Sequence, residues 1–204
     1  IIDLPNMGTR PERDYFADAA SRVLAVLDPF VAIAAAAEKE PVKATTLARR
    51  LIRSHHKDAK WAHNLVGLIR RNGGDTASAI ADFRAAIEID PGFLPARANL
   101  GHTLIQTGDL AGAKAEFEEI RRRAPRDVRA AEGFAELAMA QGDADAAVAR
   151  FKEAADLDPL NPRYLALAGK IELDRGKKDE GVTLLSRALE LAPGYLPAFA
   201  SLAA

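Results

Sequence analysis

One pattern returns four times along the chain at a constant spacing of 34 residues. Five positions of this repeat keep the same phase in all four copies: a small residue, a glycine, a second small residue, a large apolar residue and a proline. They are Gly67, Gly101, Ala135 and Gly169; Gly74, Gly108, Gly142 and Gly176; Ala79, Ala113, Ala147 and Gly181; Phe83, Phe117, Phe151 and Leu185; and Pro91, Pro125, Pro159 and Pro193. Such periodicity predicts a stack of similar small units, and stacks of this kind usually bind other proteins.

Each repeat is predicted to contain two helices. Small and apolar residues recur at intervals of three and four in 64–71 and again in 79–89, which is the period of a helix with one buried face. Between the two segments, a glycine can end the first helix and the aspartate that follows it can cap the second, as in Gly142-Asp143. The fourth turn, Gly176-Lys177, lacks that cap. The second helix is expected to end before the proline, which has no amide hydrogen to donate.

These residues resemble the tetratricopeptide repeat, which combines a small residue, a turn glycine, Ala, Phe and Pro in this order and at this period. The resemblance extends over residues 60–195 and divides them into units 60–93, 94–127, 128–161 and 162–195. It implies an all-α, right-handed α-solenoid of antiparallel helix pairs, with the first helices lining a concave groove. Two positions depart from the family, which prefers Trp and Tyr there, and this weakens the expected aromatic packing. The residues found are His63, Arg97, Ala131 and Leu165 at the first position and Arg70, Leu104, Ala138 and Glu172 at the second.

The two ends obey the repeat less well. Residues 1–10 are interpreted as an extended arm, and residues 11–59 as an N-terminal cap helix plus a degenerate repeat, with helices expected at 14–27, 30–40 and 41–54. Residues 196–204 are predicted to be a helix, either a cap or the start of a further repeat. Phe199 and Leu202 would leave an apolar edge there, which could mediate self-association. The sequence opens with Ile1, so we expect the natural chain to begin earlier.

Composition limits the class of protein. The chain has 204 residues, 49% of them hydrophobic, so it can bury a long continuous core. There is no run of eighteen apolar residues, so no membrane span is predicted. The absence of cysteine excludes disulfides, thiolate zinc sites and cysteine nucleophiles. We favour the cytoplasm as the compartment and keep the periplasm as the alternative, because a chain without cysteine suits both.

Positive charge gathers between Lys43 and Arg71, where eight Lys and Arg residues face one acid, Asp58. Such a stretch could meet an acidic peptide or nucleic acid. We favour the interpretation that it forms the solvated faces of helices, since aromatic residues are not interleaved with it. Nucleic acid is not expected as a partner, because the overall charge of the chain is close to zero.

No catalytic constellation is evident, so the chain is predicted not to be an enzyme. His55, His56 and His63 are close in sequence, but no carboxylate or cysteine completes a metal set, and we interpret them as surface histidines. Gly73-Gly74 is not followed by the Lys-Ser or Lys-Thr of a phosphate loop. The run that contains Glu119 and Arg121–Arg123 is expected to form ordinary surface pairs. No cofactor and no metal are predicted.

The family register indicates which residues face the groove. They are Trp61, Asn64, Leu68, Arg71 and Asn72 in the first unit; Asn99, His102, Ile105 and Gln106 in the second; Arg129, Glu132, Glu136 and Met139 in the third; and Arg163, Leu167, Lys170 and Asp174 in the fourth. This mixed surface suits an extended or helical peptide. Two hypotheses follow: an interaction scaffold that binds a peptide or subunit, or the recognition arm of a larger enzyme. In the second, a sulfotransferase, glycosyltransferase or hydroxylase domain would lie beyond Ala204.

Overall fold

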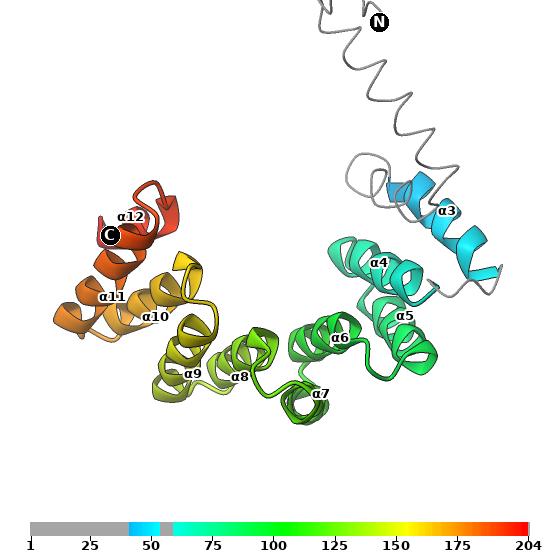
Figure 1. Ribbon diagram of the computed structural model, residues 1–204, viewed down its shortest axis with the longest axis horizontal. Helices are drawn as coiled ribbons and strands as arrows, with labels where there is room; N and C mark the ends of the chain where they lie inside the picture. The colour runs from blue at the N-terminus through cyan, green and yellow to red at the C-terminus, as the bar shows by residue number, and fades with distance from the viewer. Residues whose placement is uncertain (1–40, 54–58, 204) are drawn as a thin grey trace, which may run out of the picture. The chain divides into compact units, whose positions relative to one another are not determined.

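The computed structural model describes residues 41–53 and 59–203, and these residues form ten helices and no strand (Figure 1). The extended arm expected at 1–10 and the helices expected at 14–27 and 30–40 lie outside the described residues. The fold is all-α, as predicted. The helices are α3 (Pro41–Arg53), α4 (Ala59–Asn72), α5 (Thr76–Ile89), α6 (Leu94–Thr107), α7 (Leu110–Arg123), α8 (Val128–Ala140), α9 (Ala144–Leu157), α10 (Pro162–Asp174), α11 (Lys178–Leu191) and α12 (Leu196–Leu202).

The chain divides into two compact units, Ile1–Ala96 and Arg97–Ala204, called unit 1 and unit 2 below. In unit 1, α4 packs against both α5 and α3. In unit 2, α8 pairs with α9 and α10 with α11, and α10 also packs on α9. Each described repeat is therefore a helix hairpin, and successive hairpins within a unit share one core (Figure 1).

The turns inside the hairpins have the predicted chemistry. The turn glycines adopt positive φ, for example 77° at Gly142, a region that residues with a side chain rarely enter. The carboxylate of Asp143 then accepts a hydrogen bond of 2.9 Å from the amide of Ala146 and caps α9. Asp75 and Asp109 cap α5 and α7 in the same way, whereas Lys177 makes no side-chain cap to α11.

Phe117 shows how the small and large positions of the repeat fit together. Its ring is fully buried and lies against Gly101 of α6, where an added Cβ would come within 2.6 Å of a ring carbon. A Cβ at Gly133 of α8 would also overlap the ring. Phe117 therefore fills the space between its own hairpin and the next one, and both glycines are needed to admit it.

At four of the eight positions where the family prefers Trp and Tyr, the residue is charged or histidine and belongs to an ion pair: His63, Arg70, Arg97 and Glu172. In unit 1, Asp82 is 8% exposed and accepts a hydrogen bond of 2.6 Å from Arg70, and its other oxygen lies 3.4 Å from His63 Nδ1. In unit 2, Arg97 donates to Glu116 at 2.7 Å. Polar side chains thus replace the aromatic contacts, and each buried charge keeps the partner that makes its burial tolerable.

The last helix, α12, packs on α10 and α11. Ala198 is fully buried in this contact, while Phe199 is 50% exposed and Leu196 is 76% exposed. An apolar surface is therefore present at this helix.

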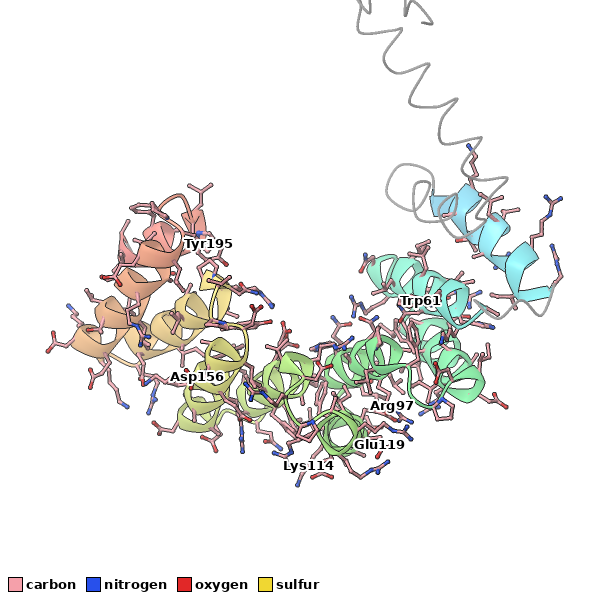
Figure 2. The ribbon with its side chains drawn as sticks, viewed as in Figure 1. Trp61, Arg97, Lys114, Glu119, Asp156 and Tyr195 are labelled. Carbon is pink, nitrogen blue, oxygen red and sulfur yellow. The ribbon has the colours of Figure 1, made fainter. Side chains whose placement is uncertain are left out.

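On α7, Glu119 pairs with Arg122 and Arg123, as expected for a surface helix. The hydrogen bonds from these two residues lower the pKa of Glu119, which Figure 2 labels, to about 2.

Candidate functional site

In unit 1, the predicted groove residues lie on α4 and differ in accessibility. Trp61, which Figure 2 labels, is 38% exposed, and its ring meets Phe93 edge-on with the ring centroids 4.4 Å apart. Beside them, Lys60 forms an ion pair of 2.6 Å with Asp90. Asn64 is only 8% exposed, so a partner would reach little of its side chain. Leu68 and Arg71 are half-buried, and Asn72 is exposed.

In unit 2, the predicted groove residues come from three helices. On α6, Gln106 is exposed and the other members are half-buried; on α8, Met139 is 49% exposed and the others are half-buried. On α10, Leu167 is half-buried and the charged members are exposed. The half-buried members are Asn99, His102 and Ile105 on α6 and Arg129, Glu132 and Glu136 on α8; the exposed charged members on α10 are Arg163, Lys170 and Asp174. This set is called the first-helix face below.

Side-chain pairs connect the three helices of the first-helix face. His102 Nδ1 lies 2.7 Å from an oxygen of Glu136 and so connects α6 to α8. Arg163 donates to Glu132 and connects α10 to α8. The hydroxyl of Tyr164 also donates to Glu132, at 3.4 Å. Burial and the charge of Glu132 raise the pKa of Tyr164 to about 12, so this hydroxyl keeps its proton at neutral pH.

Arg129 is held by its own helix terminus. Its guanidinium donates to both oxygens of Asp127, at 2.8 and 2.6 Å, and the same carboxylate accepts from the Arg129 amide and caps α8. The hydrogen bond from the guanidinium lowers the pKa of Asp127, against the opposing effect of burial. On α10, Lys170 donates to Asp174 at 2.7 Å. Every titratable member of the first-helix face therefore already has a partner within the chain.

The structure also contains a hollow that the repeat register did not predict. It has a volume of about 740 Å³ and lies between the second helices α9 and α11. Ala155, Leu165 and Leu184 are at most 8% exposed at its floor, and Leu191 is 41% exposed at its rim. Its charged side chains are Asp156, Asp179, Glu180, Glu190, Lys152 and Arg187. Among the described residues, none of these six has an ion-pair partner. These six residues could have been found by listing the charged residues of the second helices in the sequence. They were missed because the family register assigns only first-helix positions to the groove.

The described residues hold no group of three or more His, Cys, Asp or Glu side chains that could bind a metal ion. His55 and His56 lie outside them. The interpretation of His63 as a surface residue is wrong, because its side chain is 18% exposed and faces Asp82 in the pair described above. Within 41–53 and 59–203, no helix has the length and apolar character of a transmembrane span.

Two family models, both described as tetratricopeptide repeat, match the chain. One covers residues 13–92 and 133–195, and the other covers residues 73–136. The chain belongs to the tetratricopeptide-repeat family. Proteins of this family are interaction modules, and the fold is typically non-catalytic.

Solved structures with the same fold have low sequence identity to this chain. TTC0263, a TPR protein of Thermus thermophilus, is 20% identical, with a TM-score of 0.67 over 79% of this chain and 90% of that one. MamA from Desulfovibrio magneticus RS-1 is 19% identical, with a TM-score of 0.62 over 77% and 88%. YrrB is 16% identical, with a TM-score of 0.59 over 87% and 92%. No curated protein matches in sequence. At these identities the similarity establishes the fold alone.

Proposed function

We propose that this protein is a non-enzymatic interaction scaffold that binds an extended or helical peptide of a partner protein along the first-helix face. The observation that carries the proposal is the continuity of this face across α6, α8 and α10. His102–Glu136 joins the first two helices and Glu132–Arg163 joins the last two. A ligand along the face would therefore meet one connected, ordered surface, which lowers the entropy lost on binding.

The exposed residues of the face supply the contacts. Met139 lies three positions after Glu136 on α8, and Lys170 lies seven after Arg163 on α10, so each shares a helix face with a paired residue. The thioether of Met139 offers an adaptable apolar contact, and Lys170 and Gln106 offer hydrogen-bond donors. These groups suit a peptide with an apolar anchor and acidic or amide side chains.

YrrB, which shares the fold, is described as a TPR protein with an unusual peptide-binding site. Peptide binding by that protein supports the same class of ligand here. It does not indicate which residues of this chain take part, so the proposed residues rest on the contacts described above.

Selection from a displayed peptide library tests the proposal. Peptides are selected against the immobilised full chain and then measured by isothermal titration with the wild-type chain and with a Met139→Glu, Lys170→Glu variant. We expect the variant to lose at least about tenfold in affinity, because it removes an apolar anchor and reverses a charge.

The control is Lys114→Glu on the second helix α7, where the side chain is 60% exposed (Figure 2). This variant makes the same charge reversal as Lys170→Glu but outside the first-helix face, and it should bind with unchanged affinity. Selected peptides that bind the Met139→Glu, Lys170→Glu variant as tightly as wild type would show that the ligand lies elsewhere. A library that yields no binder would argue against a peptide ligand for this face.

A further inference from the structure

The hollow between α9 and α11 has an excess of negative charge that the protein itself does not neutralise. Asp156, Asp179, Glu180 and Glu190 face only two bases, and the six charges have no ion-pair partner among the described residues. The floor is apolar, while the charged side chains around it are exposed, so a ligand would meet apolar contact at the floor and solvent-exposed acids at the rim. We call this feature the acidic hollow. It favours a cationic, partly apolar ligand.

A segment with these properties exists in unit 1 of the same chain. Helix α3 carries Lys43, Arg49, Arg50 and Arg53 and has no acidic residue. Ala44 and Ala48 are fully buried on the side of α3 that packs on α4. The four basic residues are exposed, and so is Val42, at 81%. Among the described residues, Arg49, Arg50 and Arg53 have no ion-pair partner.

The exposed residues of α3 form one continuous stripe. Val42, Thr46, Arg49 and Arg53 are spaced by four, three and four positions, which places them on one side of a helix, and the exposed Lys43 and Arg50 border them on that side. This stripe is called the basic stripe. At 1.5 Å per residue it extends over roughly 16 Å, and the part of α11 that lines the hollow, from Asp179 to Leu191, extends over roughly 18 Å. The two surfaces match in length.

The order of residues along the two helices also matches when they run antiparallel. Arg50 and Arg53, in the last turn of α3, would then lie near Asp179 and Glu180, in the first turn of α11. At the other end of the pair, Lys43 would lie near Glu190, and Val42 near Leu191. In the antiparallel arrangement, basic residues of α3 face acidic residues of α11 at both ends. The exposed Val42 then meets the exposed Leu191 at the rim of the hollow.

We propose that the basic stripe of α3 in one copy of this protein docks into the acidic hollow of a second copy. The contact is a helix in a groove, with apolar contact at one end and ion pairs along its length. Two different surfaces meet, so the association is heterologous: a reciprocal pair of contacts closes a dimer, and successive one-way contacts extend an oligomer. Because most of the attraction is between partly exposed charges, added salt weakens it.

Sedimentation equilibrium of the full chain tests this association over a range of protein concentrations. We expect the mass to rise above that of the monomer with concentration, and the dissociation constant to increase by about tenfold or more when salt is raised from about 0.05 to about 0.5 M. Two reversals, Arg49→Glu with Arg50→Glu and Asp179→Lys with Glu180→Lys, should each increase the dissociation constant by at least about tenfold, since each places like charges opposite each other.

A chain that carries both reversals together should associate again, because the charges are then complementary with exchanged signs. This outcome also distinguishes lost attraction from lost folding, and helix content measured by circular dichroism checks each variant directly. Asp156→Lys provides a third reversal near the C-terminal end of α9, where a cation favours the helix. The matched controls are Arg126→Glu and Glu88→Lys, both at exposed sites outside the two surfaces and outside the first-helix face, and neither should change the dissociation constant.

Three results would overturn the proposal. The first is a wild-type mass that stays monomeric at every concentration and salt level. The second is association that the reversals leave unchanged. The third is association that Phe199→Ser abolishes while the charge reversals have no effect, because the apolar surface of α12 would then carry it. Failure of the peptide test on the first-helix face would not affect any of these results, since the residues tested are different.

Discussion

Two surfaces of unit 2 use charge in opposite ways. On the first-helix face, each titratable residue has a partner in the chain, as in Glu132 with Arg163. In the acidic hollow, charged side chains such as Asp156 and Glu190 have none among the described residues. A paired surface offers shape and ordered hydrogen-bonding groups, whereas an unpaired one offers net attraction. The residue type at a repeat position therefore indicates where a ligand can lie. Whether electrostatic attraction contributes to binding depends on whether the charged side chains are already paired within the chain.

The largest effect is expected in the core beneath the first-helix face, where the ring centroid of Phe117 lies 5.4 Å from that of His102. Phe117→Ala removes a fully buried ring between Gly101 and Gly133. It should lower the free energy of unfolding by about 3 to 5 kcal/mol, the usual cost of such a cavity. Urea denaturation followed by circular dichroism measures it. Phe199→Ala, at a half-exposed ring, is the control and should cost much less. Equal losses for the two variants would mean that Phe117 is not the shared support of the hairpins.

A smaller effect is expected at the α8 terminus beside the first-helix face. The Arg129 guanidinium holds the pKa of Asp127 below its ordinary value of 3.8, so the pair stabilises the folded state above that pH. This stabilisation should be lost as the pH falls below 3.8 towards the folded-state pKa. Asp127→Asn keeps a capping side chain but removes the charge, and should cost about 0.5 to 1 kcal/mol at pH 7.

The measurement is urea denaturation of the wild type and Asp127→Asn at several pH values between neutral and strongly acidic. The difference between the two should shrink as Asp127 takes up its proton. A difference that stays constant with pH would show that the ion pair with Arg129 does not contribute, and that only the cap distinguishes the two side chains.

The smallest effects are expected from variants that compare the first-helix face with the acidic hollow directly. A double-mutant cycle with Glu132→Gln and Arg163→Gln should give a coupling energy of about 0.5 kcal/mol, because this pair is partly exposed. Asp156→Asn and Glu190→Gln should leave stability unchanged or raise it by a few tenths of a kcal/mol, since these acids are unpaired and lie near helix C-termini. A clear loss of stability in the hollow variants would reveal partners there and remove the contrast.

The repeat made most of the fold predictable. Gly142 and Asp143 determine a turn by local chemistry, since one residue must adopt positive φ and the other must accept an amide hydrogen bond. Phe117 and Gly133 are 16 positions apart, but the constant period places them in contact. Such features depend on interactions that the spacing alone specifies, so the sequence was sufficient for them.

The site was less predictable, because ion pairs depend on which side chains meet in space. Asn64 was assigned to the groove by its repeat position, yet it is 8% exposed. The sequence indicates that His63 is a surface residue, yet its side chain is 18% exposed and its Nδ1 lies 3.4 Å from a carboxylate oxygen of Asp82 on the neighbouring helix. The family register predicts which way the side chain at a repeat position usually faces. Neighbouring side chains from another helix decide how far that side chain is buried and which ion pairs it forms.

The sequence by itself determined the family, the helix hairpins and their turns, because each follows from spacing and backbone preference. Only the tertiary structure showed that the charges of the first-helix face are already paired, and that those between α9 and α11 are not. The physical reason is that Coulomb attraction acts through distance and solvent exposure, and both are fixed when the helices pack.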